Sequence, residues 1–278
     1  MDDENAYQSL AAAGGDARWA FGTGFEDPLH GVDDAFPAGL DEAARADLAT
    51  RCVTLGDDAL VSAQRLAEWC TRAPELEVET ALANIGLDLL GQARLLYSRA
   101  GRADGTGRGE DDFAYLRGPE EFRNVRLAEL PNGDFAFSVA RLLVLSSWRL
   151  GELAGLTSSP DPVLAAVAAK AVPELAYHRE YAAGWAVRLG DGTEESRARM
   201  GRALGEVAPW LPELYAAAPA GREPVEEALA LVASETGLAV PGAAPVPGSG
   251  RDGDHTGHLA PLLAELQSVA RAHPGAVW

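Results

Sequence analysis

The stretch from residue 74 to residue 97 constrains the fold more than any other part of the chain. Its apolar side chains recur every three or four positions, which is the spacing of a helix with one buried face. That face consists of Leu82, Ile85, Leu89 and Leu96, with Gln92 or Ala93 in the gap. Asn84, Asp88 and Gln92 follow one another at intervals of four and form a polar line beside it. A polar line along a buried helix predicts a ligand site, the remnant of such a site, or an interface.

Apolar periodicity and capping residues predict four long helices and several short ones. Pro74 is expected in the first turn of its helix, where its missing N–H costs nothing. Pro173 falls inside another helical pattern, so a kink or a break is expected there. The expected N-caps are Asp41, Asp134, Asp161 and Thr193. The long helices are expected at about 41–73, 74–101, 135–156 and 162–189. Shorter helices are expected at 112–117, 119–127, 224–234 and 256–272. A further helix is expected to begin at residue 193, with interruptions at Pro209 and Pro212.

Composition supports an all-α fold and narrows the range of partners. Alanine, leucine and glutamate dominate, and few segments alternate as strands do. A net charge of −19 argues against nucleic acid and against anionic membranes as partners. No signal peptide or membrane span is recognisable, so a cytoplasmic protein is expected. Cys52 and Cys70 are expected to be buried free thiols, since 18 residues along one helix place them about 27 Å apart.

The first 40 residues differ from the helical region, residues 41–278. They are rich in Gly, Asp and Ala and show little periodicity. They nevertheless carry four aromatic residues, whereas disordered tails are usually poor in aromatics. Two interpretations therefore stay open, a flexible tail or an arm that docks on a partner. The aromatic residues are Trp19, Phe21, Phe25 and Phe36.

Polar residues inside a helical bundle suggest a carboxylate-bridged di-iron site, which requires a particular spacing of ligands. It needs a Glu from each of two helices and an E-x-x-H pair from each of the other two. Three residues after Asp88 stands a glycine, and three residues after Glu174 stands a tyrosine, with His178 one position later. Asp57 lies about thirty residues before Asp88, in the place of a lone carboxylate ligand. The corresponding position before Glu174 is Ser146.

The ligand count is thus too low for a di-iron centre. Asp57, Asp88, Glu174 and His178 are the candidates for a vestigial site, and we expect them to bind one another and nearby Arg and Tyr groups in place of metal. No catalytic residue and no cofactor is assigned to this chain. The H-x-x-H pair of His255 and His258 has no further ligand in view, so capping and surface roles are expected.

Several long segments are similar to one known family. These are SAQRLAEWCTRAPELEVETALANIGLDLLGQARLLY, LPNGDFAFSVARLLV, AAKAVPELAYHREYAAGWAVRLGDGT and HTGHLAPLLAELQSVARAHPGAVW. In this order they resemble the C subunits of the bacterial ring-1,2-phenylacetyl-CoA epoxidases. The similarity extends from about Leu55 to the C-terminus, and Pro173 departs from the family pattern.

The resemblance implies a ferritin-like four-helix bundle with additional short helices and a C-terminal helix. In that family the di-iron centre belongs to a catalytic A subunit, and the C subunit resembles a sister of A that has lost its ligands. A small B subunit, a further D protein and a reductase with FAD and an iron–sulfur cluster complete the system. The reaction implied for the whole is epoxidation of the aromatic ring of phenylacetyl-CoA by O₂, with NADPH as the electron source.

The sequence therefore predicts a non-catalytic structural subunit that pairs with the A subunit. Two alternatives stay open. The chain could be a metal-binding oxygenase subunit in its own right, or a module that binds acyl-CoA through phosphate contacts. Whether it forms a homo-oligomer without its partner also stays open. The basic residues considered for the phosphates are Arg65, Arg94, Arg123 and Arg126.

Overall fold

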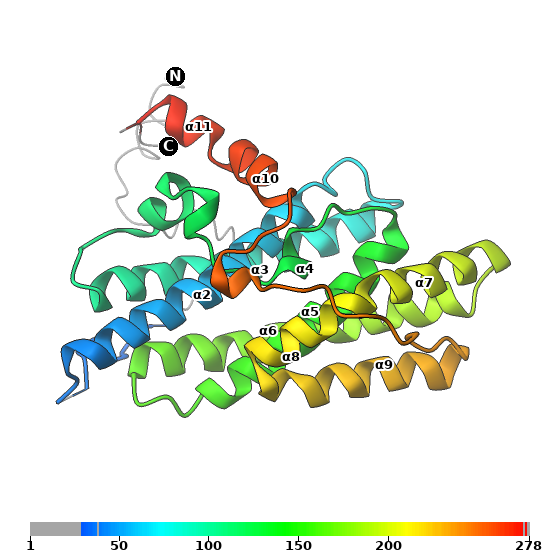
Figure 1. Cartoon of the computed structure of the whole chain (residues 1–278), viewed down its shortest axis with the longest axis horizontal. Helices are drawn as coiled ribbons and strands as arrows, with labels where there is room; N and C mark the ends of the chain where they lie inside the picture. Colours follow the sequence, from blue (N-terminus) through cyan, green and yellow to red (C-terminus); the bar gives the residue numbers. More distant parts are fainter. Residues whose placement is uncertain (1–28, 38, 275, 277–278) are drawn as a thin grey trace, which may run out of the picture.

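Four long helices form the body of the molecule in the computed structural model, which describes residues 29–37, 39–274 and 276. They are α2 (Glu42–Ala67), α3 (Leu76–Ala103), α5 (Phe135–Leu156) and α6 (Pro162–Gly190). α2 packs along α3, α5 packs along α6, and α3 meets α6 (Figure 1). The described residues form no β-strand. The prediction of an all-α, ferritin-like bundle is confirmed.

Three of the four long helices, α2, α5 and α6, begin at the predicted caps. The side chains of Asp41, Asp134 and Asp161 each accept a hydrogen bond from the backbone N–H three residues on, at 2.8, 2.9 and 2.8 Å. Thr193 caps the helix that follows α6 in the same way, at 3.1 Å. Such a bond satisfies one of the N–H groups that a helix start leaves unpaired. The predicted buried stripe on α3 is also confirmed, because Leu82, Ile85, Leu89, Gln92, Ala93 and Leu96 are all buried.

The connection between α2 and α3 is longer than predicted. α2 ends at Ala67 and α3 begins at Leu76, so Pro74 precedes the helix and is not in its first turn. The intervening turn reverses the chain through Thr71, which adopts a left-handed φ of 68°. Trp69 anchors this turn, since its indole N–H donates to Ser138 Oγ at 3.1 Å. The turn residues are therefore held by tertiary contacts that the helical pattern could not reveal.

Of the two outcomes predicted at Pro173, a kink or a break, the break is wrong, because α6 runs through it as one 29-residue helix. Proline removes the hydrogen bond to the carbonyl four residues earlier, which here belongs to Ala169. Both Pro173 and Ala169 are exposed, so water can solvate the released carbonyl. The helix tolerates the proline because the lost bond lies on its solvent side.

Shorter helices cover the bundle on two sides (Figure 1). α7 and α9 pack against α5 and α6, while the C-terminal helices α10 and α11 contact the short segments before α4. The predicted helix 119–127 is wrong, because residues 122–125 are extended between a short 3₁₀ turn and α4. The predicted helix 256–272 is divided at Gln267, whose side chain donates to the carbonyls of Ala114 and Arg117, both at 3.0 Å. The bounds are α4 Arg126–Glu129, α7 Glu194–Val207, α8 Leu211–Ala217, α9 Arg222–Thr236, α10 Leu259–Leu266 and α11 Ser268–Ala272.

Part of the predicted N-terminal extension packs on the bundle. The Phe36 ring contacts the guanidinium groups of Arg45 and Arg99, which lie 4.5 and 4.1 Å from its centroid. Such cation–π contacts contribute about 0.5–2 kcal/mol each. The other three aromatic residues of the extension, Trp19, Phe21 and Phe25, lie outside the described residues. None of the described helices combines the length and the apolarity needed to cross a membrane.

The two cysteines have different surroundings. Cys52 is fully buried in α2, and burial raises the pKa of its thiol to about 12. Cys70 lies in the turn after α2 and is exposed, so the prediction of two buried thiols is wrong for this residue. Both are free thiols.

α5 approaches the segment before α9 very closely. Its buried Trp148 donates from the indole N–H to the Leu214 carbonyl at 2.8 Å. A Cβ at Gly151, one turn further along α5, would lie 2.3 Å from the Ala220 carbonyl oxygen and 2.8 Å from Gly221 Cα. Only glycine allows this contact, because both neighbouring groups are backbone and cannot turn aside.

Replacing Gly151 by alanine should therefore force α5 away from this segment. We expect Gly151→Ala to lower the free energy of unfolding by about 1–3 kcal/mol. Gly155→Ala is the matched control, since a Cβ at this exposed position of the same helix meets nothing within 4 Å. It should be neutral or stabilise by up to about 1 kcal/mol. Urea unfolding of both variants measures the difference, and equal stabilities would contradict the close-approach argument.

Candidate functional site

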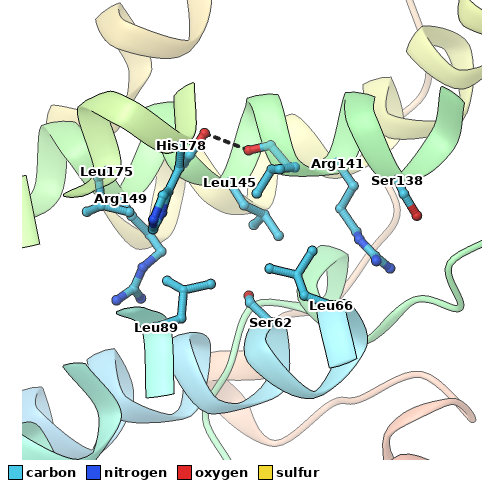
Figure 2. A pocket seen from close by; sticks show the side chains of 11 residues that line it. Ser62, Leu66, Leu89, Ser138, Arg141, Leu145, Arg149, Leu175 and His178 are labelled. Carbon is cyan, nitrogen blue, oxygen red and sulfur yellow. Dashed lines mark hydrogen bonds between the residues drawn. The ribbon is translucent and has the colours of Figure 1, made fainter. Parts of the chain in front are cut away.

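A small cavity lies inside the bundle, between α2, α3, α5 and α6 (Figure 2). The space open to the centre of a water molecule is about 20 Å³. Five leucines line it together with six polar residues, which are Ser62, Ser138, Arg141, Ser146, Arg149 and His178. This is the location where helical bundles place metal and cofactor sites, built from side chains of facing helices.

Arg149 carries a positive charge into this region from α5 and is 1% exposed. Its guanidinium donates to the Leu55 carbonyl on α2 at 3.2 Å and to Gln92 Oε1 on α3 at 3.0 Å. The nearest carboxylate is Asp58, at 3.9 Å. Burial lowers the pKa of Arg149, although Asp58 opposes this effect. One guanidinium thus joins three of the four long helices.

Gln92 extends the contact to α6. Its amide N–H donates to Glu174 Oε2 at 3.0 Å, while its carbonyl oxygen accepts from Arg149. Glu174 also forms an ion pair with Lys170, one turn earlier on α6. Of the polar line predicted on α3, only the last residue, Gln92, is buried in the core. Asn84 is exposed, and Asp88 is 38% exposed.

Asp58 also pairs with a second arginine, whose side chain is 17% exposed. Arg251, from the loop before α10, donates to both carboxylate oxygens of Asp58, at 3.0 and 2.7 Å. The backbone N–H of Val125 also donates to Asp58 Oδ1, at 2.8 Å. This carboxylate therefore ties the C-terminal loop to α2. Removing one partner of a buried ion pair typically lowers the free energy of unfolding by about 3–5 kcal/mol.

Asp57, the residue before Asp58 on α2, belongs to a second network. Its carboxylate accepts from the Tyr97 hydroxyl at 2.6 Å and from the Arg123 backbone N–H at 2.8 Å. Arg117 forms an ion pair with the same carboxylate. Burial, followed by the charge of Asp57, raises the pKa of Tyr97 well above its usual value. The network closes the segment before α4 over the α2–α3 pair.

His178 faces the cavity and is fully buried, with its Nε2 3.0 Å from the Asp88 carboxylate. Of the four residues predicted as a vestigial site, the structure brings only Asp88 and His178 into direct contact. Glu174 is linked to the cavity through Gln92, and Asp57 is not part of it. Across the described ranges no group of three or more His, Cys, Asp or Glu side chains could hold a metal ion. The donor set does not fit a carboxylate-bridged di-iron centre, because each carboxylate is engaged elsewhere and a guanidinium reaches the same cavity.

The two histidines of the H-x-x-H motif diverge. His258 is exposed, whereas the side chain of His255 is buried between Glu129 Oε2 at 3.0 Å and the Phe122 carbonyl at 2.9 Å. The expected surface role is therefore wrong for His255. Burial alone would lower the pKa of His255, but the hydrogen bonds to Glu129 and Phe122 outweigh burial and raise it. This pair holds the loop before α10 against α4.

The arginines considered as phosphate contacts already have partners within the chain. Arg65 donates to the Glu129 carbonyl, and Arg126 pairs with Glu213 at 3.0 Å; both arginines are buried. Arg94 pairs with Glu110 on the surface, and Arg123 donates to nearby carbonyls. A phosphate would have to displace these partners.

Sequence reasoning missed the residues that organise the core, above all Arg149, Asp58 and Glu152. A signal was present, since Arg141 and Arg149 are the only charged residues in the stretch 135–150. Both arginines are buried, and burial lowers the pKa of Arg141 to about 9. Their partners come from other helices and from loops, so periodicity along one helix could not identify them.

Glu152 lies one turn after Trp148 on α5, near Asp58. Its Oε2 is buried without a hydrogen-bond partner. Burial and then the charge of Asp58 raise the pKa of Glu152 to about 7. The folded chain therefore holds this proton more tightly than the unfolded chain does, and stability falls as the pH rises from about 4.5 to about 7.

Glu152→Gln should remove that pH dependence, because glutamine stays neutral. We expect equal stability of variant and parent near pH 3, well below both pKa values, where the carboxyl is protonated in the folded and the unfolded parent. Near pH 8 the variant should be more stable by roughly 2–3 kcal/mol. The exposed Glu206→Gln is the control and should change stability by less than about 0.5 kcal/mol at either pH. Denaturant unfolding at the two pH values tests this, and a pH-independent difference for Glu152→Gln would refute it.

Comparison with known proteins agrees with this architecture. Residues 37–278 match the family described as phenylacetic acid catabolic protein. The chain is also 41% identical over 239 residues to the C subunit of the 1,2-phenylacetyl-CoA epoxidase of Escherichia coli (strain K12). That match covers 81% of this chain and 96% of the relative. The chain therefore belongs to the phenylacetic acid catabolic protein family.

Proposed function

We propose that this chain is the C subunit of a phenylacetyl-CoA 1,2-epoxidase and serves as its non-catalytic structural subunit. The observation that carries the proposal is the charge arrangement at the bundle centre. Arg149 supplies a positive charge there, and the predicted vestigial residues are each engaged with protein groups. The near-complete coverage of a relative that bears the name of the C subunit supports the assignment to this complex.

In the proposed complex the chain pairs with a catalytic A subunit that holds a di-iron centre. A rigid bundle on one side of that subunit would keep its metal-bearing helices in place, as preorganised metal sites require. A B subunit and a reductase with FAD and an iron–sulfur cluster, fed by NADPH, complete the proposed cytoplasmic system for phenylacetate degradation. The strongly acidic chain would favour basic surfaces on these partners.

Two measurements test this function. The first is the iron content of the full-length chain, purified alone after expression with iron and beside a copurification with the A subunit. We expect almost no iron in the chain alone and a stable complex with the A subunit. Asp88→Ala and His178→Ala should leave the iron content unchanged. Iron that approaches two atoms per chain and is lost in these variants would instead support a metal-binding oxygenase.

The second measurement is epoxidation of phenylacetyl-CoA by the A subunit with its reductase, with and without this chain. Loss of outer support around metal ligands typically costs about ten- to a hundredfold in activity. We expect a decrease of that size when the chain is left out. Equal stability and activity of the isolated A subunit would reject the structural role. Binding of CoA to the chain alone, measured by calorimetry, would favour the acyl-CoA-binding alternative.

A further inference from the structure

Three buried polar atoms that line the central cavity have no hydrogen-bond partner. They are Ser62 Oγ on α2, Arg149 Nε on α5 and His178 Nδ1 on α6. All three side chains are at least nine-tenths buried. A buried donor or acceptor that stays unpaired costs about 1–3 kcal/mol. Three such atoms around one cavity therefore point to a ligand inside it.

The size of the cavity limits the ligand to a single heavy atom. About 20 Å³ is open to the centre of a water molecule, and roughly 10–15 Å³ is needed to hold one water. In Figure 2 the His178 ring and the Arg149 guanidinium point into the same end of the cavity, beside Leu89 and Leu175. Ser62 rises toward it from α2.

The hydrogen-bonding capacity of Arg149 Nε and His178 Nδ1 determines which ligand can bind. Arg149 Nε–H can only donate. His178 Nε2 lies 3.0 Å from the Asp88 carboxylate, which can only accept, so Nε2 carries the proton. In the neutral ring Nδ1 is then an acceptor. A ligand that bridges Arg149 and this neutral form of the ring accepts from Arg149 Nε–H and donates to His178 Nδ1. Water does both, whereas a halide cannot donate and a metal cation would be repelled by the guanidinium.

We propose that this cavity is a binding site for one ordered water molecule, held by Arg149 Nε and His178 Nδ1, with Ser62 on the opposite wall. The water completes a hydrogen-bonded chain from the partly exposed Asp88 through His178 to Arg149 in the core. It lies between facing helices, where helical bundles build metal and cofactor sites. This inference goes beyond the proposed function and holds whether or not the chain pairs with an A subunit.

The test is a crystal structure of the full-length chain, grown in sodium bromide and at a resolution that shows ordered water. We expect one density peak within hydrogen-bonding distance of both Arg149 Nε and His178 Nδ1, without anomalous signal at the bromine edge. An anomalous bromide peak would identify an anion site and overturn the proposal. An empty cavity, or a peak with the anomalous signal of a metal, would overturn it as well.

Two variants sharpen the test. His178→Leu removes the acceptor and should abolish the peak, while Ser62→Ala removes only the opposite wall's hydroxyl and should retain it. A peak of unchanged height in His178→Leu would show that the imidazole does not hold the water. If His178→Leu does not fold, the parent structure and the bromide measurement still decide the proposal.

Discussion

The rest of the bundle depends on the compensation of one buried positive charge, the guanidinium of Arg149. It is fully desolvated, so its charge must be compensated by groups that converge on it. Leu55, Gln92 and Asp58 provide these groups from α2 and α3, and Asp58 in turn engages Arg251 from the C-terminal loop. Removing any member leaves another buried charge uncompensated. The register of the long helices and the position of the loop are therefore fixed together.

This arrangement explains how a ferritin-like bundle can keep polar residues in its interior without the E-x-x-H pairs of a di-iron protein. In such proteins metal ions offset the negative charge of several carboxylates. Here arginines offset it, and the carboxylates are distributed over separate networks. Asp57 binds Arg117 and Tyr97, whereas Asp58, the next residue, binds Arg251. Two adjacent acids thus pair with different arginines while both accept backbone N–H groups of the segment before α4.

Local sequence signals predicted the helices well where an N-cap residue or a periodic row of apolar residues was present. Asp134 and Asp161 mark the starts of α5 and α6, and the stripe of α3 is buried as its spacing indicated. They did not predict the division of the last helix at Gln267, whose side chain donates to the distant carbonyls of Ala114 and Arg117. The candidate site was only partly predictable. The contact of Asp88 with His178 follows from two helices packing, but spacing within a helix carries no information about Arg149 and its partners.

The contrast between the two thiols has a practical consequence. Cys52 is sealed in the core with a pKa of about 12, so it stays protonated and inaccessible at neutral pH. Cys70 is exposed at the corner where α2 ends and the chain turns toward α3. The natural chain therefore offers one position for a fluorophore or spin label without any substitution. A probe attached there would report on the approach of another protein to that corner of the bundle.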